Sequence, residues 1–264
     1  MNRIDKVFLD LKKRKKTGLI TFITAGDPDL RMTKSLVLEM EKNGADIIEL
    51  GVPFTDPLAD GPTIQKASLR ALKNNTSLKD VIGLIRDIRK DSQIPLVIMS
   101  SYNPILRYGE EKFIKDACVS GLDGAIIPDL PPEEGENLIR ESESVGLNLI
   151  FLIAPTTPHK RAKLIAEKSR GFIYYISLLG ITGERKGLSR EIKKGISKIR
   201  NLTDKPVAVG FGISSPEQIE ALSSIADGVI IGSAIVKVIE KNLKNQRLIS
   251  SVGKFVNLLK KSIH

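Results

Sequence analysis

The chain repeats one short pattern eight times: a segment of five to seven residues that is rich in Val, Ile and other apolar residues. The segments are almost continuously apolar and do not alternate with polar residues, which is typical of strands that are buried on both faces. Such strands belong to parallel sheets that helices cover on each side. The segments are residues 19–24, 46–52, 95–100, 123–128, 147–153, 172–177, 206–210 and 227–232.

Helical patterns lie between these segments, for example at 29–44, 77–91, 110–121 and 216–225. Several of them begin with a cap residue or a proline. Alternating strands and helices at spacings of roughly thirty residues predict an α/β fold, a (β/α)8 TIM barrel. We expect a single such domain over residues 1–264, with an extra N-terminal helix, because no linker or low-complexity tract divides the chain. A doubly wound open sheet is the alternative fold.

The composition is that of an ordinary soluble protein, since 41% of the 264 residues are hydrophobic and 27% are charged. No apolar run approaches the roughly 20 residues that span a bilayer. The first segment, MNRIDKVFLDLKKRKKTG, lacks the apolar core of a signal peptide. A single cysteine, Cys118, excludes an internal disulfide and fits a reducing compartment. We therefore expect a cytoplasmic protein, or one of the plastid stroma if the gene is organellar.

The net charge of +10 raises the question of an anionic partner. The dense basic run is KKRKK at 12–16, aromatic residues make up only 5% of the chain, and tryptophan is absent. Nucleic-acid-binding proteins use aromatic stacking platforms or a recognition helix, and the sequence shows neither motif. We interpret the basic charge as a solvated surface and expect neither nucleic acid nor a membrane as a partner.

The segment ELGVPFTDPLADGP, residues 49–62, holds acids in a stiff loop. Glu49 closes the second apolar segment, and three prolines then restrict the backbone around Asp56 and Asp60. In a (β/α)8 barrel the chemistry lies at the carboxyl ends of the strands and in the loops that follow. These acids should therefore face the same mouth as Asp129, which follows the fourth segment.

The pattern alone leaves two interpretations of Glu49 open: a carboxylate satisfied by a neighbouring base, or a catalytic acid or base. The chain has two histidines, His159 and His264, and neither lies at a strand end. It has no GxSxG, CxxC, HExxH or Walker motif. Nucleophilic and metal-dependent chemistry are therefore disfavoured, no metal site is expected, and general acid–base catalysis by carboxyl groups remains.

Glycines close the last two apolar segments, in GFG at 210–212 and at Gly232, which Ser233 follows. Glycine lets an anion approach the backbone N–H groups, and the helix that follows offers its positive amino-terminal end. Loops after the last two strands often bind phosphate in this fold. The sequence therefore predicts a phosphate site here, and the alternative is that these glycines only form tight turns.

With these motifs in view, the chain resembles the tryptophan synthase α subunit family over essentially its whole length. ELGVPFTDPLADGP is similar to the family's most characteristic motif, which usually has Ser where Thr55 stands. Other segments of the chain match family segments in the right order along the sequence: TFITAGDP (21–28), PDLPPEE (128–134), SLLGITG (177–183), VGFGIS (209–214) and ADGVIIGSAIV (226–236).

The resemblance implies a lyase that cleaves indole-3-glycerol phosphate, by a retro-aldol reaction, to indole and glyceraldehyde 3-phosphate. It implies that Glu49 is the catalytic acid/base and that Asp60 is the partner of the indole ring nitrogen. It also implies the residues that hold the substrate: Phe22, Ile126, Asp129 and Tyr174 at the indole end, Gly183, Phe211, Gly212, Gly232 and Ser233 at the phosphate, and Thr182 on a loop that closes beside Asp60.

The resemblance further implies that this chain needs no cofactor of its own. Its expected partner is a tryptophan synthase β subunit, which carries pyridoxal phosphate and consumes the indole in an α2β2 heterotetramer. One departure concerns SSYNP at 100–104, where the family commonly has TYYNP, so that Ser101 replaces an aromatic residue near the indole pocket. We also expect a mobile lid over GITGERKGLSRE at 180–191, which has three glycines and no apolar periodicity.

Two other functions stay open on the sequence. A different phosphate-binding barrel enzyme of the same pathway would share the glycine-rich phosphate site, but would not need the rigid loop between Glu49 and Asp60. A regulatory subunit that only binds a partner would not need either acid. An assay of indole release distinguishes the three functions.

Overall fold

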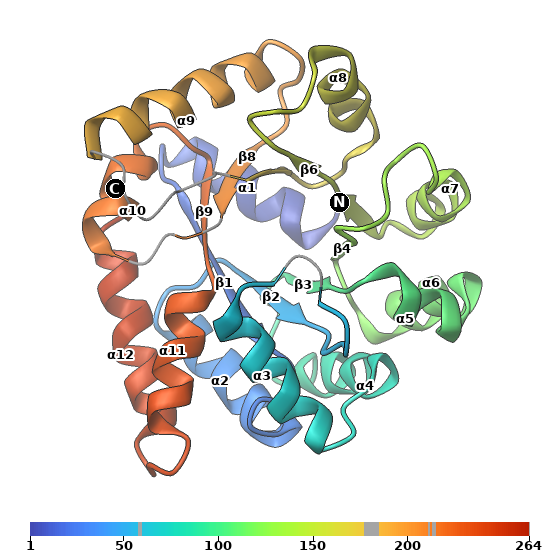
Figure 1. Cartoon of the computed structure of the whole chain (residues 1–264), viewed down its shortest axis with the longest axis vertical. Helices are drawn as coiled ribbons and strands as arrows, with labels where there is room; N and C mark the ends of the chain where they lie inside the picture. The colour runs from blue at the N-terminus through green and yellow to red at the C-terminus, as the bar shows by residue number, and fades with distance from the viewer. Residues whose placement is uncertain (58–59, 177–184, 211, 213–214, 264) are drawn as a thin grey trace.

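The computed structural model of the chain describes residues 1–57, 60–176, 185–210, 212 and 215–263, with the backbone alone for 185–190. This part forms a ring of parallel strands with helices around it (Figure 1). Around the sheet, the strands follow one another in chain order, and β1 pairs with both β2 and β9. The strands are β1 (Gly18–Thr24), β2 (Ile47–Gly51), β3 (Leu96–Met99), β4 (Gly124–Ile126), β5 (Asn148–Ile150), β6 (Leu152–Ile153), β7 (Ile173–Ile176), β8 (Val207–Gly210) and β9 (Gly228–Ile231).

The fifth predicted strand is divided into β5 and β6 at Phe151. β5 pairs with β4, and β6 pairs with β7, so the two halves together close the ring. At the break, the N–H of Phe151 donates to the hydroxyl of Ser169 at 3.1 Å instead of joining the ladder with β4. The predicted barrel of eight strands is therefore confirmed, with one strand in two pieces. The open sheet is excluded, because the strand order has no reversal.

The helices lie outside this ring, apart from the first (Figure 1). The helical patterns predicted at 29–44, 77–91, 110–121 and 216–225 correspond to α2, α4, α6 and α10. The helices are α1 (Arg3–Lys13), α2 (Leu30–Lys42), α3 (Pro62–Lys73), α4 (Leu78–Ile88), α5 (Tyr102–Tyr108), α6 (Glu110–Ser120), α7 (Glu136–Val145), α8 (His159–Lys168), α9 (Arg185–Arg200), α10 (Pro216–Ser223), α11 (Ser233–Asn242) and α12 (Leu248–Lys261). In the described part of the chain, no helix combines the length and the apolar character that a membrane crossing requires.

The lid expected over residues 180–191 is wrong in its second half. Helix α9 begins at Arg185, so 185–191 are helical and are not a loop. The polar composition of this stretch hides the helix, because its apolar residues begin to recur only with Leu188 and Ile192. Residues 180–184 lie outside the described residues.

Residues along each strand alternate between the barrel interior and the layer beneath the helices. On β2, for example, Ile47 joins the interior cluster, whereas Ile48 and Leu50 join the outer one. Both faces are buried, which explains why the strand segments are apolar without alternation. The interior cluster contains Ile20, Ile47, Val97, Ile126, Ile150, Phe172, Tyr174, Ala208 and Ile230 from the strands and their ends.

Helix α1 closes the amino-terminal end of the barrel. Its N-cap residue, Asn2, accepts the N–H of Ile4 with its side-chain oxygen and so caps the beginning of the helix. Ile4, Phe8 and Leu11 lie on one face and belong to the interior cluster. The ring of Phe8 contacts that of Phe172 with 5.6 Å between centroids. The extra N-terminal helix predicted from the sequence is thus the floor of the barrel.

Three aspartates clamp the strands at this end in the same way. Asp46, Asp123 and Asp227 directly precede β2, β4 and β9. The backbone N–H of each aspartate donates to the carbonyl of one residue on a neighbouring strand. The carboxylate of the aspartate accepts the backbone N–H of that same partner residue. These pairings fix the register of adjacent strands. The partner residues are Leu19, Leu96 and Val207, with N–O distances to the carboxylates of 2.6, 2.8 and 2.8 Å.

The same three carboxylates also bind cations from distant parts of the chain. Asp123 is the most enclosed case: it pairs with Arg3 at 3.0 Å and with Arg89 at 2.5 Å. The side chain of Arg89 is only 9% exposed. A buried charge that loses its partner is costly, so this pair holds the floor together.

We expect Asp123→Ala to lower the free energy of unfolding by about 3–5 kcal/mol, because it leaves the Arg89 guanidinium buried without its counterion. Urea denaturation measures this change. Asp116→Ala is the matched control, since Asp116 pairs with Lys112 on the surface of α6, and it should change the denaturation midpoint little. Equal effects of the two substitutions would contradict the assignment of Asp123 to the floor.

Candidate active site

Glu49 is the middle residue of β2 and has the same orientation as Ile47, so its side chain enters the barrel interior. The side chain is 1% exposed. Its register partners on the neighbouring strands are Phe22 on β1 and Val97 on β3. A carboxyl group is therefore held among apolar residues, in the middle of β2, whereas the sequence placed it at the end of the strand.

Neither carboxyl oxygen of Glu49 has a hydrogen-bond partner among the described residues. Burial, and then the nearby negative charge of Asp60, raise the pKa of Glu49 to about 8. The group is therefore mostly protonated at neutral pH. The interpretation of Glu49 as a carboxylate satisfied by a neighbouring base finds no support within the described part of the chain. A neutral, unpartnered acid in a dry interior fits a proton donor.

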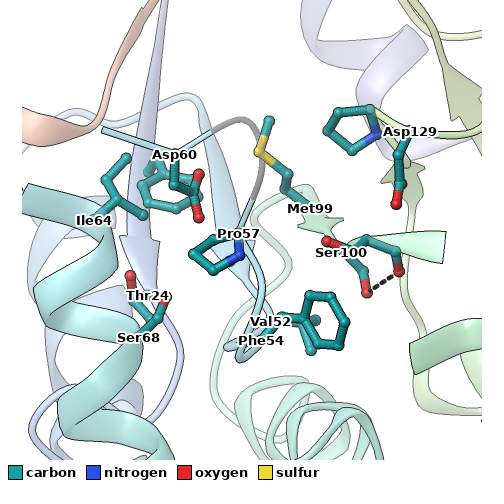
Figure 2. Close-up of a pocket in the computed structure, with 14 residues that line it drawn as sticks. Thr24, Val52, Phe54, Pro57, Asp60, Ile64, Ser68, Met99, Ser100 and Asp129 are labelled. Carbon is teal, nitrogen blue, oxygen red and sulfur yellow. Dashed lines mark hydrogen bonds between the residues drawn. The ribbon is translucent and has the colours of Figure 1, made fainter. Parts of the chain in front are cut away.

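Asp60 lies in the loop after β2, just before Gly61 and Pro62, which begin α3. It is half-buried, and burial raises its pKa above the ordinary value. Figure 2 shows its carboxylate directed into a cavity. Water still reaches this group, and the amino-terminal end of α3 favours negative charge beside it, so Asp60 is the carboxyl group better suited to ionise.

The other acid of the loop, Asp56, is not part of the cavity. It is exposed, and its carboxylate accepts the hydroxyl of Thr55 at 2.6 Å. The loop therefore directs one of its two aspartates inward and the other to solvent.

The cavity beside Asp60 has a volume of about 190 Å³. The strand ends of β1, β2 and β3 and the loops after them form its walls (Figure 2). Phe22, Gly51 and Val52 make one apolar wall, and Phe22 is the register partner of Glu49. A largely apolar pocket with a few directed polar groups suits an aromatic ligand. The lining residues are Phe22, Thr24, Gly51, Val52, Phe54, Pro57, Asp60, Ile64, Ser68, Met99, Ser100, Ser101, Pro128 and Asp129.

Phe22 fits closely against two glycines at strand ends. A Cβ added to Gly51 would lie 2.5 Å from the ring of Phe22, and one added to Gly232 would lie 3.1 Å from it. Position 51 therefore depends on the absence of a side chain, and position 232 has little room for one. Through Phe22, the wall of the cavity continues toward the start of α11, where the phosphate site is predicted.

Asp129 lies at the opposite side of the cavity from Asp60, with Met99 between them (Figure 2). Its carboxylate accepts the N–H of Tyr102 at 2.8 Å, at the beginning of α5. Asp129 thus both lines the cavity and supports α5. Ser101 lines the cavity too, and its carbonyl accepts the hydroxyl of Ser100 at 2.9 Å. The small residue that departs from the family pattern does face the cavity.

Tyr174 and Ile126 are buried in the barrel interior, and neither lines the cavity. Burial, followed by the negative charges of Glu49 and Asp60, raises the pKa of Tyr174 well above its ordinary value. Its phenol therefore stays protonated beside the two acids. Ile126 contributes apolar packing beneath the cavity.

At the predicted phosphate end, Gly232 caps α11 and Ser233 is the first residue of that helix. No side chain of a described residue caps this end, and the first turn of the helix offers its N–H groups to an anion. Gly212 is exposed and has a positive φ of 74°. Thr182, Gly183 and Phe211, the other residues expected at this end, lie outside the described residues.

A second cavity, of about 320 Å³, lies at the opposite end of the barrel and collects cations from the basic run. Lys12, Lys16 and Arg200 line it. Arg200 pairs with Asp227 at 3.3 Å, and Lys205 donates to three backbone carbonyls. The positive charges of Arg200 and Lys205 are therefore already partly satisfied by these partners. The basic run thus faces the floor, away from Glu49.

Thr24 and Ser68 line the main cavity and were not predicted as site residues. The hydroxyl of Thr24 is buried and has no hydrogen-bond partner among the described residues. The position of Thr24 at the end of β1, in line with the other strand ends, could have indicated it. Ser68 lies within α3, and no sequence signal singled it out. In the described ranges, no group of three or more His, Cys, Asp or Glu side chains is placed to hold a metal ion.

Comparison with known proteins gives a single family. A family model described as "Tryptophan synthase alpha chain" matches residues 8–263. The tryptophan synthase alpha chain of Geobacter sp. (strain M21) is 45% identical over 263 residues, which cover 100% of this chain and 98% of that protein. The structure of tryptophan synthase subunit alpha from Legionella pneumophila str. Paris has a TM-score of 0.92 at 36% identity, covering 99% of this chain and 98% of that one.

A structure of tryptophan synthase from M. tuberculosis, in an aminoacrylate-bound form, has a TM-score of 0.89 at 30% identity and covers 100% of both chains. The match extends over essentially the whole chain and its fold. The family predicted from the motifs is confirmed, and the chain belongs to the tryptophan synthase alpha chain family.

Proposed function

We propose that this chain cleaves indole-3-glycerol phosphate to indole and glyceraldehyde 3-phosphate, with Glu49 as the acid and base and Asp60 as the partner of the ring nitrogen. The observation that carries this proposal is the state of Glu49: a buried carboxyl group with a pKa of about 8 and no partner for either oxygen among the described residues. Membership of the family supports the reaction. It is a carbon–carbon lyase reaction in tryptophan biosynthesis.

The first step needs an acid. Protonated Glu49 gives its proton to the ring carbon that carries the glycerol chain, and the ring becomes an electron sink with positive charge on its nitrogen. The carboxylate of Asp60, directed into the cavity (Figure 2), accepts the N–H and stabilises that charge. Opposite charge held in place before the reaction, in a site with little water, is commonly the largest contribution to catalysis.

The second step needs a base. Glu49, now ionised, removes the proton from the hydroxyl on the carbon attached to the ring. The electrons of that O–H bond form the aldehyde, the C–C bond breaks, and its electron pair returns to the ring. Glu49 ends the cycle protonated, so the reaction consumes no net proton and needs no cofactor in this chain. The raised pKa suits both roles, because it lies near neutral pH.

The phosphate of the substrate binds, in this proposal, at the first turn of α11. Gly212, Gly232 and Ser233 supply backbone N–H groups there, and the helix amino terminus favours the anion. We extend the same role to Gly183 and Phe211 and place Thr182 beside Asp60, as the family motifs imply. Phe22 spans the distance between the two ends by packing against both Gly51 and Gly232.

We also propose a tryptophan synthase β subunit as the partner that consumes the indole, in an α2β2 assembly. Pyridoxal phosphate then belongs to the β subunit, which carries out the chemistry that needs it. Membership of the alpha chain family supports a β partner. Indole is small and apolar, so direct transfer between subunits would limit its loss to water.

We expect Glu49→Gln to reduce turnover by roughly 10²–10⁴-fold or more while substrate affinity stays nearly unchanged, because the amide neither gives nor takes the proton. Steady-state assays of indole release by the purified chain, alone and with a β subunit, measure this. Wild-type turnover in the variant would show that another group carries the proton.

Asp60→Asn should also lower the turnover number, because a neutral amide does not offset the charge on the ring nitrogen. Asp56→Asn is the matched control in the same loop, since Asp56 is exposed and bonded to Thr55. It should leave the activity of the isolated chain close to that of the wild type. Similar losses in both variants would mean that the loop, and not the charge of Asp60, is required.

Glu49→Gln should also change the pH dependence of stability. The folded pKa of about 8 lies above the unfolded value of 4.5, and burial is the main cause. The unfolded chain therefore releases this proton first, and wild-type stability falls as pH rises from about 4.5 to about 8, by up to about 1.4 kcal/mol per pH unit from this group. The variant lacks this loss. Urea titrations at pH 5, 7 and 9 should show a stability advantage of the variant that grows with pH and levels off above 8; a constant difference would mean that Glu49 does not titrate in this range.

A further inference from the structure

Arg70 connects three segments that surround the site. It lies on α3, and its guanidinium forms a fork with the carboxylate of Asp27, with Nε–Oδ1 at 2.7 Å and Nη2–Oδ2 at 2.8 Å. Its Nη1 also reaches Glu240 of α11 at 3.4 Å. Asp27 is in the loop after β1 and is only 1% exposed. None of these residues lines the cavity, so their contacts play no direct part in the chemistry described above.

The two helices that Arg70 links begin at the two ends of the proposed site. α3 begins at Pro62, directly after Asp60 and Gly61, and α11 begins at Ser233. The two helices lie side by side (Figure 1). Arg70 lies eight residues into α3 and Glu240 seven residues into α11. At 1.5 Å per residue, both are roughly 10–12 Å below the helix starts, so the link joins the helices at the same depth.

Apolar packing fills the space between this link and the site. Ala67 of α3, Val236 of α11 and Phe22 of β1 form one cluster. The side chain of Asn74, at the end of α3, also donates to the carbonyl of Pro28 in the loop after β1. α3 is thus anchored to this loop twice, while its contact with α11 depends on the cluster and the ion pair.

Apolar packing resists separation of two helices better than it resists sliding, because it has little directionality. A forked pair between a guanidinium and a carboxylate has fixed geometry in its plane and resists sliding as well. The fork with Asp27 therefore holds α3 in place against the loop after β1. The contact of Nη1 with Glu240 extends this restraint to α11, where the small Ala67–Val236 contact has little directionality.

We propose that Arg70 is a positioning residue: through Asp27 and Glu240 it fixes the spacing between the carboxyl group of Asp60 and the start of α11, so that the ring and the phosphate of one substrate molecule reach both ends of the site at once. This inference depends on the proposed function. A substrate of fixed length requires fixed spacing, and a misplacement of about 1 Å can lower the rate by about 10²-fold. Separate fragments of the substrate have no such requirement.

The test uses Arg70→Lys in the full-length chain, which keeps the positive charge and removes the fork. We expect kcat/KM for indole-3-glycerol phosphate to fall by roughly 10–100-fold. The dissociation constants of indole alone and of glycerol 3-phosphate alone, measured by calorimetry, should remain within about twofold of wild type, because each end of the site stays intact.

Arg89→Lys is the matched control. Arg89 also pairs with a buried aspartate, Asp123, but at the floor of the barrel. It should lower the melting temperature without changing kcat/KM by more than about twofold, since it lies far from both ends of the site. A loss of kcat/KM in the control as large as in Arg70→Lys would overturn the proposal, because general destabilisation would then explain both.

The proposal is also overturned if Arg70→Lys retains wild-type kcat/KM, or if it weakens the binding of glycerol 3-phosphate alone. If Arg70→Lys does not fold, the variant Glu240→Gln tests the proposal instead, because it removes a partly exposed partner and leaves the Arg70–Asp27 fork. Glu240→Gln should lower kcat/KM by a smaller factor and leave the affinities for indole and for glycerol 3-phosphate unchanged. Wild-type kcat/KM in Glu240→Gln refutes the role of the Arg70–Glu240 contact. A wild-type chain that releases no indole refutes the proposed function itself, and this inference with it.

Discussion

The ring of parallel strands is the constraint on which the rest of this structure depends. β5 pairs with β4 and β6 pairs with β7, so the two short strands complete the ring, and alternate side chains of the strands enter its interior. For Ile47 that direction is favourable, because burial of apolar surface stabilises the fold. For Glu49 it removes water from a carboxyl group and raises its pKa to about 8. The burial of this acid therefore follows from the register of β2. Glu49 cannot leave the interior without a slip of β2 that would also move Ile47 into the layer beneath the helices.

Carboxyl groups at the two ends of the barrel have opposite surroundings. At the amino-terminal end, Asp46, Asp123 and Asp227 each accept a backbone N–H and bind a cation. Toward the carboxyl end, Glu49 meets no hydrogen-bond partner among the residues that the structure describes. Paired acids stabilise the fold, whereas an unpaired buried acid is destabilising until a ligand satisfies it. The fold thus separates the acids that hold the barrel from the acid that we propose acts on the substrate.

Much of the barrel could be predicted from the sequence, because strands buried on both faces leave continuous apolar runs and the spacing sets the topology. The division at Phe151 could not, since it depends on the hydroxyl of Ser169, which is distant in sequence. The start of α9 at Arg185 was also missed, because a polar helix gives little apolar periodicity.

The candidate site also has features that could be predicted from the sequence and features that could not. The positions of Glu49 and Asp60 have local signals, an acid within an apolar segment and a proline-rich loop, and their roles in the reaction are proposals. The inward direction of Asp60 and the outward direction of Asp56 were not distinguished, as both occupy one loop. Thr24 and Ser68 in the cavity, and the fork between Asp27 and Arg70, arise from packing between segments that sequence patterns treat separately. Contacts of this kind leave no local signal in a single chain.

The close fit of Phe22 against Gly51 and Gly232 has a consequence for how such sequences can change over time. A side chain at position 51 would collide with the ring, whereas one at position 232 would fit only if the ring moved by a few tenths of an ångström. A smaller residue at position 22 would relieve both contacts but leave a gap in the wall between the two ends of the cavity. Substitutions at the three positions are thus expected to be coupled, and a smaller residue at position 22 is expected to precede any side chain at position 51.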